Sequence, residues 1–250
     1  WTGKQGLLQV QYDQQTQKWH AYMPVTVQAP PKPIRHAISA YVDIGVRYPI
    51  TAGHDGCTKA IAYNGAPMLS DWWYWNRKIA KASSDLKKCN GRDSSKRLSK
   101  LYRVRSRRHK DAINKMCYDY VQRCVKSGVS EIVVGDLTGI LENNDKGAKT
   151  NTMTHNFWAH AYTVERLRCT AENFGISTRL ADEYKTSSVC PWCGSGHVIK
   201  RGRLLKCLQC RREAHRDVCG MLNIGFVHGN FREGDINRVM THPEVVSDFW

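Results

Sequence analysis

"AISAYVDIGVRYPITAG", residues 37–53, begins with a mostly apolar run, carries an acid at Asp43, and then turns. The run predicts a buried strand that ends near Asp43, because Gly45 permits a tight turn there. A second strand is expected after the turn, although Pro49 lacks a backbone donor and weakens it. "CTKAIAYNG", residues 57–65, follows a His-Asp-Gly turn signal and predicts a third strand. We therefore expect a meander of three antiparallel strands.

Helices and strands alternate after this meander. Basic helices are predicted at about 69–88 and 96–127, followed by a buried strand in "EIVVGDL", residues 131–137. A helix from Phe157 to Phe174 and a strand at 176–183 come next. This order predicts an α/β protein, with helices packed on one sheet. The buried face expected for the last helix consists of Phe157, Ala161, Val164, Leu167 and Ala171.

The beginning of the chain has a different pattern. "LLQVQYDQQTQKWHAYMPVTVQ", residues 7–28, alternates around a polar turn and predicts a β-hairpin. The Pro-rich "APPKP", residues 29–33, reads as a spacer. We expect the hairpin to be the end of a preceding barrel or sheet. The chain begins at Trp1, and we expect it to be a fragment of a longer protein.

Positive charge is concentrated in the two basic helices. The net charge is +16, and residues 76–126 hold 17 Lys and Arg against four Asp. Like charges this dense repel one another unless a polyanion neutralises them, so nucleic acid is the expected partner. A solvated helical surface is the alternative. The residues expected to contact nucleic acid are Arg103, Arg105, Arg107, Arg108 and Lys110.

The ten cysteines do not suggest a secreted disulfide scaffold, because they are spread over 250 residues and four form Cys-x-x-Cys pairs. A reducing interior with a bound metal fits better. No apolar run has the length of a membrane-spanning helix. We expect a soluble, cytoplasmic, nucleoid-associated protein with no membrane partner, and its oligomeric state is left open.

The two Cys-x-x-Cys pairs predict a metal site. Four thiolates complete the tetrahedral coordination of Zn²⁺ and leave no open position, so the zinc would be structural. A redox or iron–sulfur site is the alternative. The ribbon also carries positive charges that are expected to touch phosphate, Arg203 among them. The ligands, spaced Cys-x2-Cys-x13-Cys-x2-Cys, are Cys190, Cys193, Cys207 and Cys210.

The motifs together resemble one family. "VDIGV", a basic helical pair, "IVVGDL", a helix, "YKTSSVCPWC" with "CLQC", and "HRDVCGMLNIG" occur in the order of the C-terminal half of the TnpB family. These proteins are transposon-encoded relatives of the type V CRISPR nucleases. The resemblance covers about residues 5–228, and Thr186-Ser187 and the Asp-x5-Asn-Ile motif are its most specific parts.

The resemblance implies an RNase H-like (RuvC) mixed sheet with flanking helices and an inserted zinc ribbon. It implies a nuclease that cuts DNA, guided by RNA in the full-length protein. The corresponding division is 1–33 for the end of a wedge barrel and linker, 34–185 for the first part of the nuclease domain, 186–214 for the zinc ribbon, and 215–250 for the final helix and tail.

The resemblance also implies two catalytic Mg²⁺ ions held by three carboxylates. Asp43 and Asp217 match the first and the last of these acids. In most of the family, the strand corresponding to "EIVVGDL" ends in Glu-Asp-Leu, and that glutamate is the second acid. Here the position is Gly135. Either the site is inactive or the acid has moved.

Glu183 is the candidate for the relocated acid. In an RNase H-like sheet its strand lies beside the strand that ends near Gly135, and both end at the same edge. Asp182 and Asp136 would point to the opposite face, because side chains alternate along a strand. Some family members with Gly-Asp-Leu are similar in carrying a glutamate at this place. Asp136 as the second acid, a degenerate site and a structural surface acid are the alternatives.

The expected function is Mg²⁺-dependent cleavage of DNA phosphodiester bonds by a two-metal mechanism. Two other functions are compatible with the same residues. One is a catalytically inactive nucleic-acid-binding regulator of transposition. The other is a RuvC-like nuclease specific for branched DNA junctions.

Overall fold

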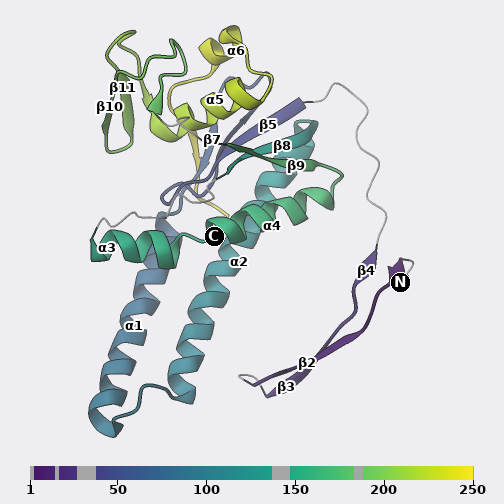
Figure 1. Ribbon diagram of the computed structural model, residues 1–250, viewed down its shortest axis with the longest axis vertical. Helices are drawn as coiled ribbons and strands as arrows, with labels where there is room; N and C mark the ends of the chain where they lie inside the picture. The colour runs from purple at the N-terminus through teal and green to yellow at the C-terminus, as the bar shows by residue number, and fades with distance from the viewer. Residues whose placement is uncertain (1–2, 15–16, 27–37, 137–146, 183–187, 250) are drawn as a thin grey trace.

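A six-stranded mixed sheet forms the centre of the molecule, with helices on both faces (Figure 1). The strand order is β13-β7-β6-β5-β8-β9. Its strands are β5 (Ile38–Asp43), β6 (Thr51–His54), β7 (Ile61–Tyr63), β8 (Val129–Asp136), β9 (Ser177–Asp182) and β13 (Glu244–Val246). The computed structural model describes residues 3–14, 17–26, 38–136, 147–182 and 188–249.

The pairing of these strands confirms the predicted α/β fold. β5, β6 and β7 form the antiparallel meander, and β5, β8 and β9 are parallel to one another. The sequence analysis missed β13, which adds in parallel to β7. Its three residues, Glu244–Val246, are too few to show a periodicity.

Helices α1 (Ala66–Asn90) and α2 (Lys96–Lys126) confirm the two predicted basic helices and form a long hairpin that projects from the sheet (Figure 1). Gly91 ends α1 in the left-handed conformation, with φ 59°. The side chain of Ser95 caps α2 by accepting a hydrogen bond of 3.1 Å from the Leu98 amide.

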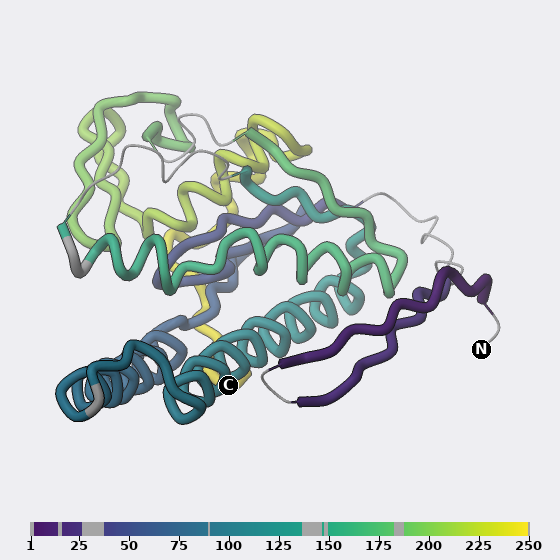
Figure 2. The backbone as a smooth tube through the Cα atoms, turned by 60° about the horizontal axis from the view of Figure 1, so that its bottom comes forward, coloured from purple at the N-terminus to yellow at the C-terminus, as the bar shows by residue number. Residues whose placement is uncertain are grey.

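The sheet lies between two layers of helices (Figure 2). An apolar cluster is buried on each of its faces. Alternate strand residues such as Val42 and Val134 pack toward α1, α2 and α4 (His160–Glu172). Their neighbours Tyr41 and Val133 pack toward α5 (Arg216–His228) and α6 (Glu233–Arg238). Each strand residue can therefore be assigned to one of two faces, here named the α2 face and the α5 face.

The predicted helix from Phe157 to Phe174 is wrong in its first part. The chain forms the short α3 (Ala148–Asn151) and a π-helical turn, η1 (Thr152–Phe157), before α4 begins. The buried face of α4 also differs, because Ala161 is exposed and Thr163 is buried. The hydroxyl of Thr163 donates to the Ala159 carbonyl at 2.9 Å, so its polar group is satisfied inside the helix and tolerates burial.

The predicted N-terminal hairpin is confirmed. β2 (Gln9–Asp13) and β3 (Lys18–Tyr22) pair in antiparallel fashion, and β1 (Lys4–Gln5) pairs with β4 (Val25–Thr26). Apolar side chains of this hairpin are exposed, Trp19 to 71%. The spacer at 29–33 lies outside the described residues, and the expected domain boundaries stay predictions.

A smaller antiparallel sheet consists of β10 (Val198–Arg201), β11 (Leu204–Cys207) and β12 (Glu213–His215). It follows the first Cys pair and leads without a break into α5. None of the helices in the described ranges combines the length and the apolarity needed to cross a membrane.

Candidate functional site

Parallel pairing brings the ends of three strands to one edge of the sheet. β5 and β8 are in register at Val42 and Val134, so the following residues, Asp43 and Gly135, lie at the same level. Gly135 is in turn aligned with Ala181 of β9. Because Val42 and Val134 belong to the α2 face, Asp43 and Gly135 belong to the α5 face.

The carboxylate of Asp43 lies directly against α5 at Gly220. A Cβ atom at Gly220 would lie 3.1 Å from Asp43 Oδ2 and 3.2 Å from Asp43 Cγ. A glycine at this position therefore lets the carboxylate reach the helix. Gly220 is three residues after Asp217, close to one helical turn. The fold thus brings Asp43 to the first turns of the helix that carries Asp217.

Asp217 is buried, and two arginines hold it. Arg203 Nη1 lies 3.1 Å from Asp217 Oδ2, and Arg216 Nε lies 3.6 Å from Asp217 Oδ1. Arg203 comes from the turn between β10 and β11, and its guanidinium lies 5.9 Å from the centre of the Tyr48 ring. The two guanidinium groups compensate the charge of this buried carboxylate and fix its orientation.

The sequence analysis assigned Arg203 only to phosphate contact and missed its pairing with Asp217. Nothing in the sequence indicates the pair, since the two residues approach only after the β10–β11 hairpin folds back on α5.

The second acid is not defined by the described residues. Asp136 follows Gly135 and therefore lies on the α2 face, away from Asp43. Asp182 is in register with Asp136, on the same face. Glu183 lies outside the described residues.

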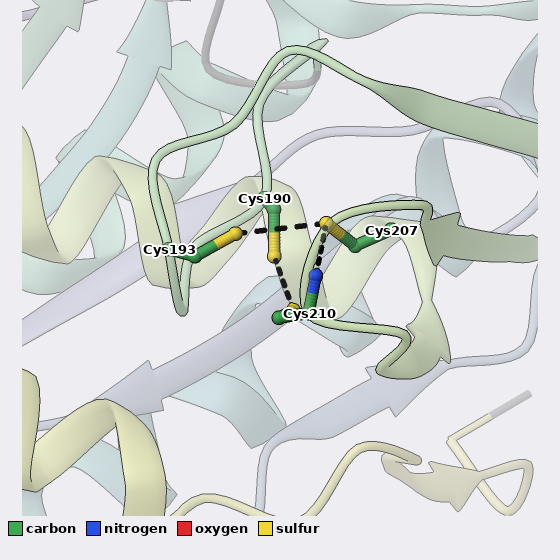
Figure 3. A group of neighbouring side chains, drawn as sticks. All are labelled: Cys190, Cys193, Cys207 and Cys210. Carbon is green, nitrogen blue, oxygen red and sulfur yellow. Dashed lines mark hydrogen bonds between the residues drawn. The ribbon is translucent and has the colours of Figure 1, made fainter.

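The four predicted zinc ligands form one cluster (Figure 3). Their Sγ atoms all lie within 4.8 Å of one another, and the pairs Cys190–Cys210 and Cys193–Cys207 are each 3.6 Å apart. A tetrahedral zinc site with Zn–S bonds of 2.3 Å has sulfur–sulfur distances of about 3.8 Å. The cluster therefore fits Zn²⁺, and the thiols are not joined as disulfides.

The pKa values of two of these thiols are shifted in opposite directions. Burial raises the pKa of the Cys190 thiol. At Cys207 burial opposes ionisation, but the backbone N–H groups of Cys210 and Gln209 and the neighbouring thiols outweigh it and lower the pKa to about 7. The Cys207 sulfur is thus the thiolate formed most readily in the cluster.

The zinc ribbon is joined closely to α5. Leu205 and Ala214 of the ribbon sheet pack against Cys219 of α5. The side-chain amide of Asn223 donates to the Val189 carbonyl at 3.0 Å, directly before Cys190. Asn223 is the asparagine of the Asp-x5-Asn motif, so this motif joins the first Cys pair to the helix that carries Asp217.

We predict one zinc ion per chain, released when Cys190 or Cys207 is replaced by Ser. Three thiolates bind zinc more weakly than four, and a ribbon this small has little apolar core to remain folded without its ion. Elemental analysis of the purified proteins measures the change. Cys169→Ser, which removes a thiol from α4 far from the cluster, should retain the metal. The absence of stoichiometric zinc in the parent chain would contradict the prediction.

The five predicted nucleic-acid contacts have two different environments. Arg105 donates to Asn76 Oδ1 at 2.5 Å and lies 5.2 Å from the centre of the Trp72 ring, and burial lowers its pKa. Arg108 makes a bidentate contact with Asp71, with Nε–Oδ2 and Nη2–Oδ1 distances of 2.9 Å. Both arginines thereby hold α2 against α1.

The other predicted contacts are on the outer side of α2. Arg107 and Lys110 are exposed, Arg103 is half-buried, and all three line a shallow hollow with Tyr102. Lys110 Nζ also lies 5.2 Å from the centre of the Tyr162 ring. Arg107 and Lys110 are therefore the exposed cations of this set that do not hold α1. Arg108 is exposed as well, but Asp71 pairs with its charge.

Comparison with known families gives two matches. The probable transposase family OrfB_IS605 matches residues 22–141, and the family Cas12f1-like, TNB domain, matches residues 160–224. The chain belongs to the TnpB family.

Two curated relatives of this TnpB chain are both named TnpB-like proteins. The TnpB-like protein ORF457 of Acidianus two-tailed virus is 23% identical over 253 residues, which is 90% of this chain and 53% of the relative. The TnpB-like protein MJ0751 of Methanocaldococcus jannaschii is 28% identical over 130 residues, which is 52% of this chain and 46% of the relative. The TnpB chain therefore spans about half the length of the curated relatives that it matches.

Solved structures share the fold of this TnpB chain. A Cas12f1–sgRNA–target DNA complex matches with a TM-score of 0.59 at 17% identity, over 87% of this chain and 55% of the other. A CRISPR–Cas12f ternary complex matches with a TM-score of 0.61 at 16% identity, over 86% and 43% of the two chains. The likeness confirms the mixed α/β fold with flanking helices.

Proposed function

We propose that this TnpB-family chain contains a Mg²⁺-dependent DNA endonuclease site and that RNA guides the full-length protein. One observation carries the proposal: the Asp43 carboxylate lies against α5 at Gly220, three residues after the buried Asp217. Asp43, at the end of β5, thus lies against the helix that carries Asp217, although the two acids are far apart in the sequence. The similarity to TnpB-like proteins and to Cas12f complexes supports this assignment.

The donor set fits magnesium, because Mg²⁺ prefers carboxylate oxygens. Asp43 and Asp217 would supply carboxylate oxygens to the metal. When bound, paired Mg²⁺ ions would stabilise charge on the scissile phosphate and favour ionisation of the attacking water. Arg203 and Arg216 would compensate the charge of Asp217 and orient it, and Arg203 would also place a positive charge beside a bound phosphate.

Glu183 is our candidate for the third carboxylate. Ala181 belongs to the α5 face, and the glutamate is two positions further along the chain, so strand alternation favours the same face. Its side chain would then approach the place that Gly135 leaves without a carboxylate. We propose the triad Asp43, Glu183 and Asp217.

The α1–α2 hairpin and the zinc ribbon would hold the nucleic acid. Arg107 and Lys110 are exposed on α2, and Arg201 and Arg211 are exposed on the ribbon. Phosphates of DNA and of a guide RNA are the proposed ligands, with Tyr102 available for stacking.

The test is a cleavage assay with the protein purified together with its bound RNA. We expect DNA matching that RNA to be cut with Mg²⁺ and to remain intact with EDTA. The Asp43→Asn/Asp217→Asn double variant should bind the same DNA without cutting it. Branched DNA that is cut in RNA-free protein would instead indicate a junction nuclease.

A second function is favoured by one observation, the glycine at position 135. A TnpB-family protein with an incomplete carboxylate set would bind nucleic acid and regulate transposition without cutting. In that case DNA binding would survive in the assay, and no Mg²⁺-dependent product would form with either the parent chain or the double variant.

We predict that Arg107→Glu/Lys110→Glu lowers affinity for DNA about tenfold or more and reduces its dependence on salt, because released counterions drive phosphate binding. Fluorescence anisotropy over a range of salt concentrations measures both effects. The matched control is Lys4→Glu/Lys18→Glu, with the same change in charge on the N-terminal hairpin. Equal losses in the two double variants would contradict a specific role for the outer face of α2.

A further inference from the structure

A second site lies at the opposite end of β6 from the acids. A cavity of about 290 Å³ lies between strands β5, β6 and β7 and the last turns of α2. Within β6, Thr51 pairs with Asp43, whereas the cavity is lined by His54, which pairs with Ala40. Ala40 belongs to the α2 face. The cavity is therefore separated from the candidate nuclease site both along the strand and across the sheet.

The cavity has an apolar interior. Ala40, Ala52 and Ile61 line it from the sheet, together with the backbone of Gly53, and Tyr120 lines it from α2. Small residues on the strands leave room for a flat group to lie on the sheet. An aromatic side chain in the wall is suited to contact with the face or edge of a base.

The rim of the cavity is basic. Lys59, Arg123 and Lys126 line it, and no acid does so among the described residues. Arg123 Nε donates to Asp119 Oδ2 at 2.8 Å, which partly neutralises its charge. Lys59 and Lys126 are exposed, and neither makes an ion pair within the described part of the chain. The rim thus offers uncompensated positive charge beside an apolar slot.

His54 adds a directional polar group. Its Nδ1 atom lies 2.9 Å from the Asp55 carbonyl oxygen, which can only accept, so Nδ1 carries the proton. In the neutral ring Nε2 is then a hydrogen-bond acceptor. An exocyclic amino group of a base is a suitable donor for it.

We propose that this cavity binds one nucleotide, with the base in the apolar slot and the phosphate at Lys59 and Lys126. The volume is close to the lower end of the range for small-molecule sites and suits a single nucleotide. The positive rim favours an anion, and the apolar slot favours one that carries a flat apolar group. The nucleotide is either free or an unstacked unit of a bound strand.

Equilibrium binding of AMP, adenosine and orthophosphate to the 250-residue chain tests the proposal. We expect AMP to bind more tightly than either part alone. Lys59→Glu/Lys126→Glu should weaken AMP binding about tenfold or more, since a hydrogen bond to a charged group contributes about 1.5–3 kcal/mol. Lys4→Glu/Lys18→Glu, with the same change in charge, should leave it unchanged. Ile61→Trp, which fills the slot from a partly exposed position, should also weaken it.

A DNA strand containing 2-aminopurine distinguishes a free nucleotide from an unstacked nucleotide of a bound strand. Fluorescence that rises on binding to the parent chain, but not to Lys59→Glu/Lys126→Glu at saturating protein, assigns the site to an unstacked unit of the strand. AMP binding without this rise assigns it to a free nucleotide. Three results would overturn the proposal. They are orthophosphate binding as tight as AMP binding, equal AMP binding by Lys59→Glu/Lys126→Glu and the parent chain, and no binding of either AMP or the 2-aminopurine strand. Circular dichroism checks that the variants are folded.

Discussion

Replacing Asp217 by asparagine should reduce Mg²⁺-dependent DNA cleavage at least about a hundredfold, because one missing carboxylate disturbs both metal binding and the water that attacks the phosphate. Asparagine has nearly the same shape and its carbonyl oxygen can still accept from Arg203. The change therefore removes the charge while α5 keeps its packing. The measurement is the single-turnover cleavage rate at saturating protein, which separates chemistry from binding.

Asp182→Asn is the matched control for this experiment. The Asp182 carboxylate is exposed and on the α2 face, so the same loss of one charge should leave most of the cleavage rate intact. Zinc content and DNA affinity should be unchanged in both variants. A cleavage rate in Asp217→Asn within a few-fold of the parent would show that this acid does not hold the catalytic metals.

Replacing Glu183 by glutamine should have an effect of similar size, at least about a hundredfold on the cleavage rate, because glutamine supplies no charged oxygen to a cation. DNA binding should persist, since the basic residues of α2 are unchanged. Asp136→Asn, one residue from Gly135 but on the α2 face, is the control that should retain activity.

A rescue experiment makes this prediction sharper. Gly135 and Ala181 are paired on neighbouring strands, so residues 135 and 183 would approach the site from adjacent positions. Gly135→Glu in the Glu183→Gln background should recover part of the cleavage if both positions address the same metals. Undiminished cleavage by Glu183→Gln would identify the acid as a surface residue. Complete inactivity of the parent chain would favour the regulatory function.

The amino-acid sequence by itself determined the strands of the meander, the two basic helices and the cluster of four cysteines. Each depends on a short-range pattern: apolar residues in a run for β5 and β8, a helical period for α2, and ligand spacing for Cys190 and its partners. These features depend on neighbouring residues in the sequence and not on which distant elements pack against them.

Only the tertiary structure decided which side chains meet. Three sets of contacts depend on elements that approach one another only after folding. They are the Arg203–Asp217 pair, the contact of Asp43 with Gly220, and the contacts of Arg105 and Arg108 with α1. Charge alone made all the arginines of α2 look equivalent. Their roles differ because one side of α2 faces α1 and the other faces solvent. The charges along α2 do not indicate which of its sides contacts α1.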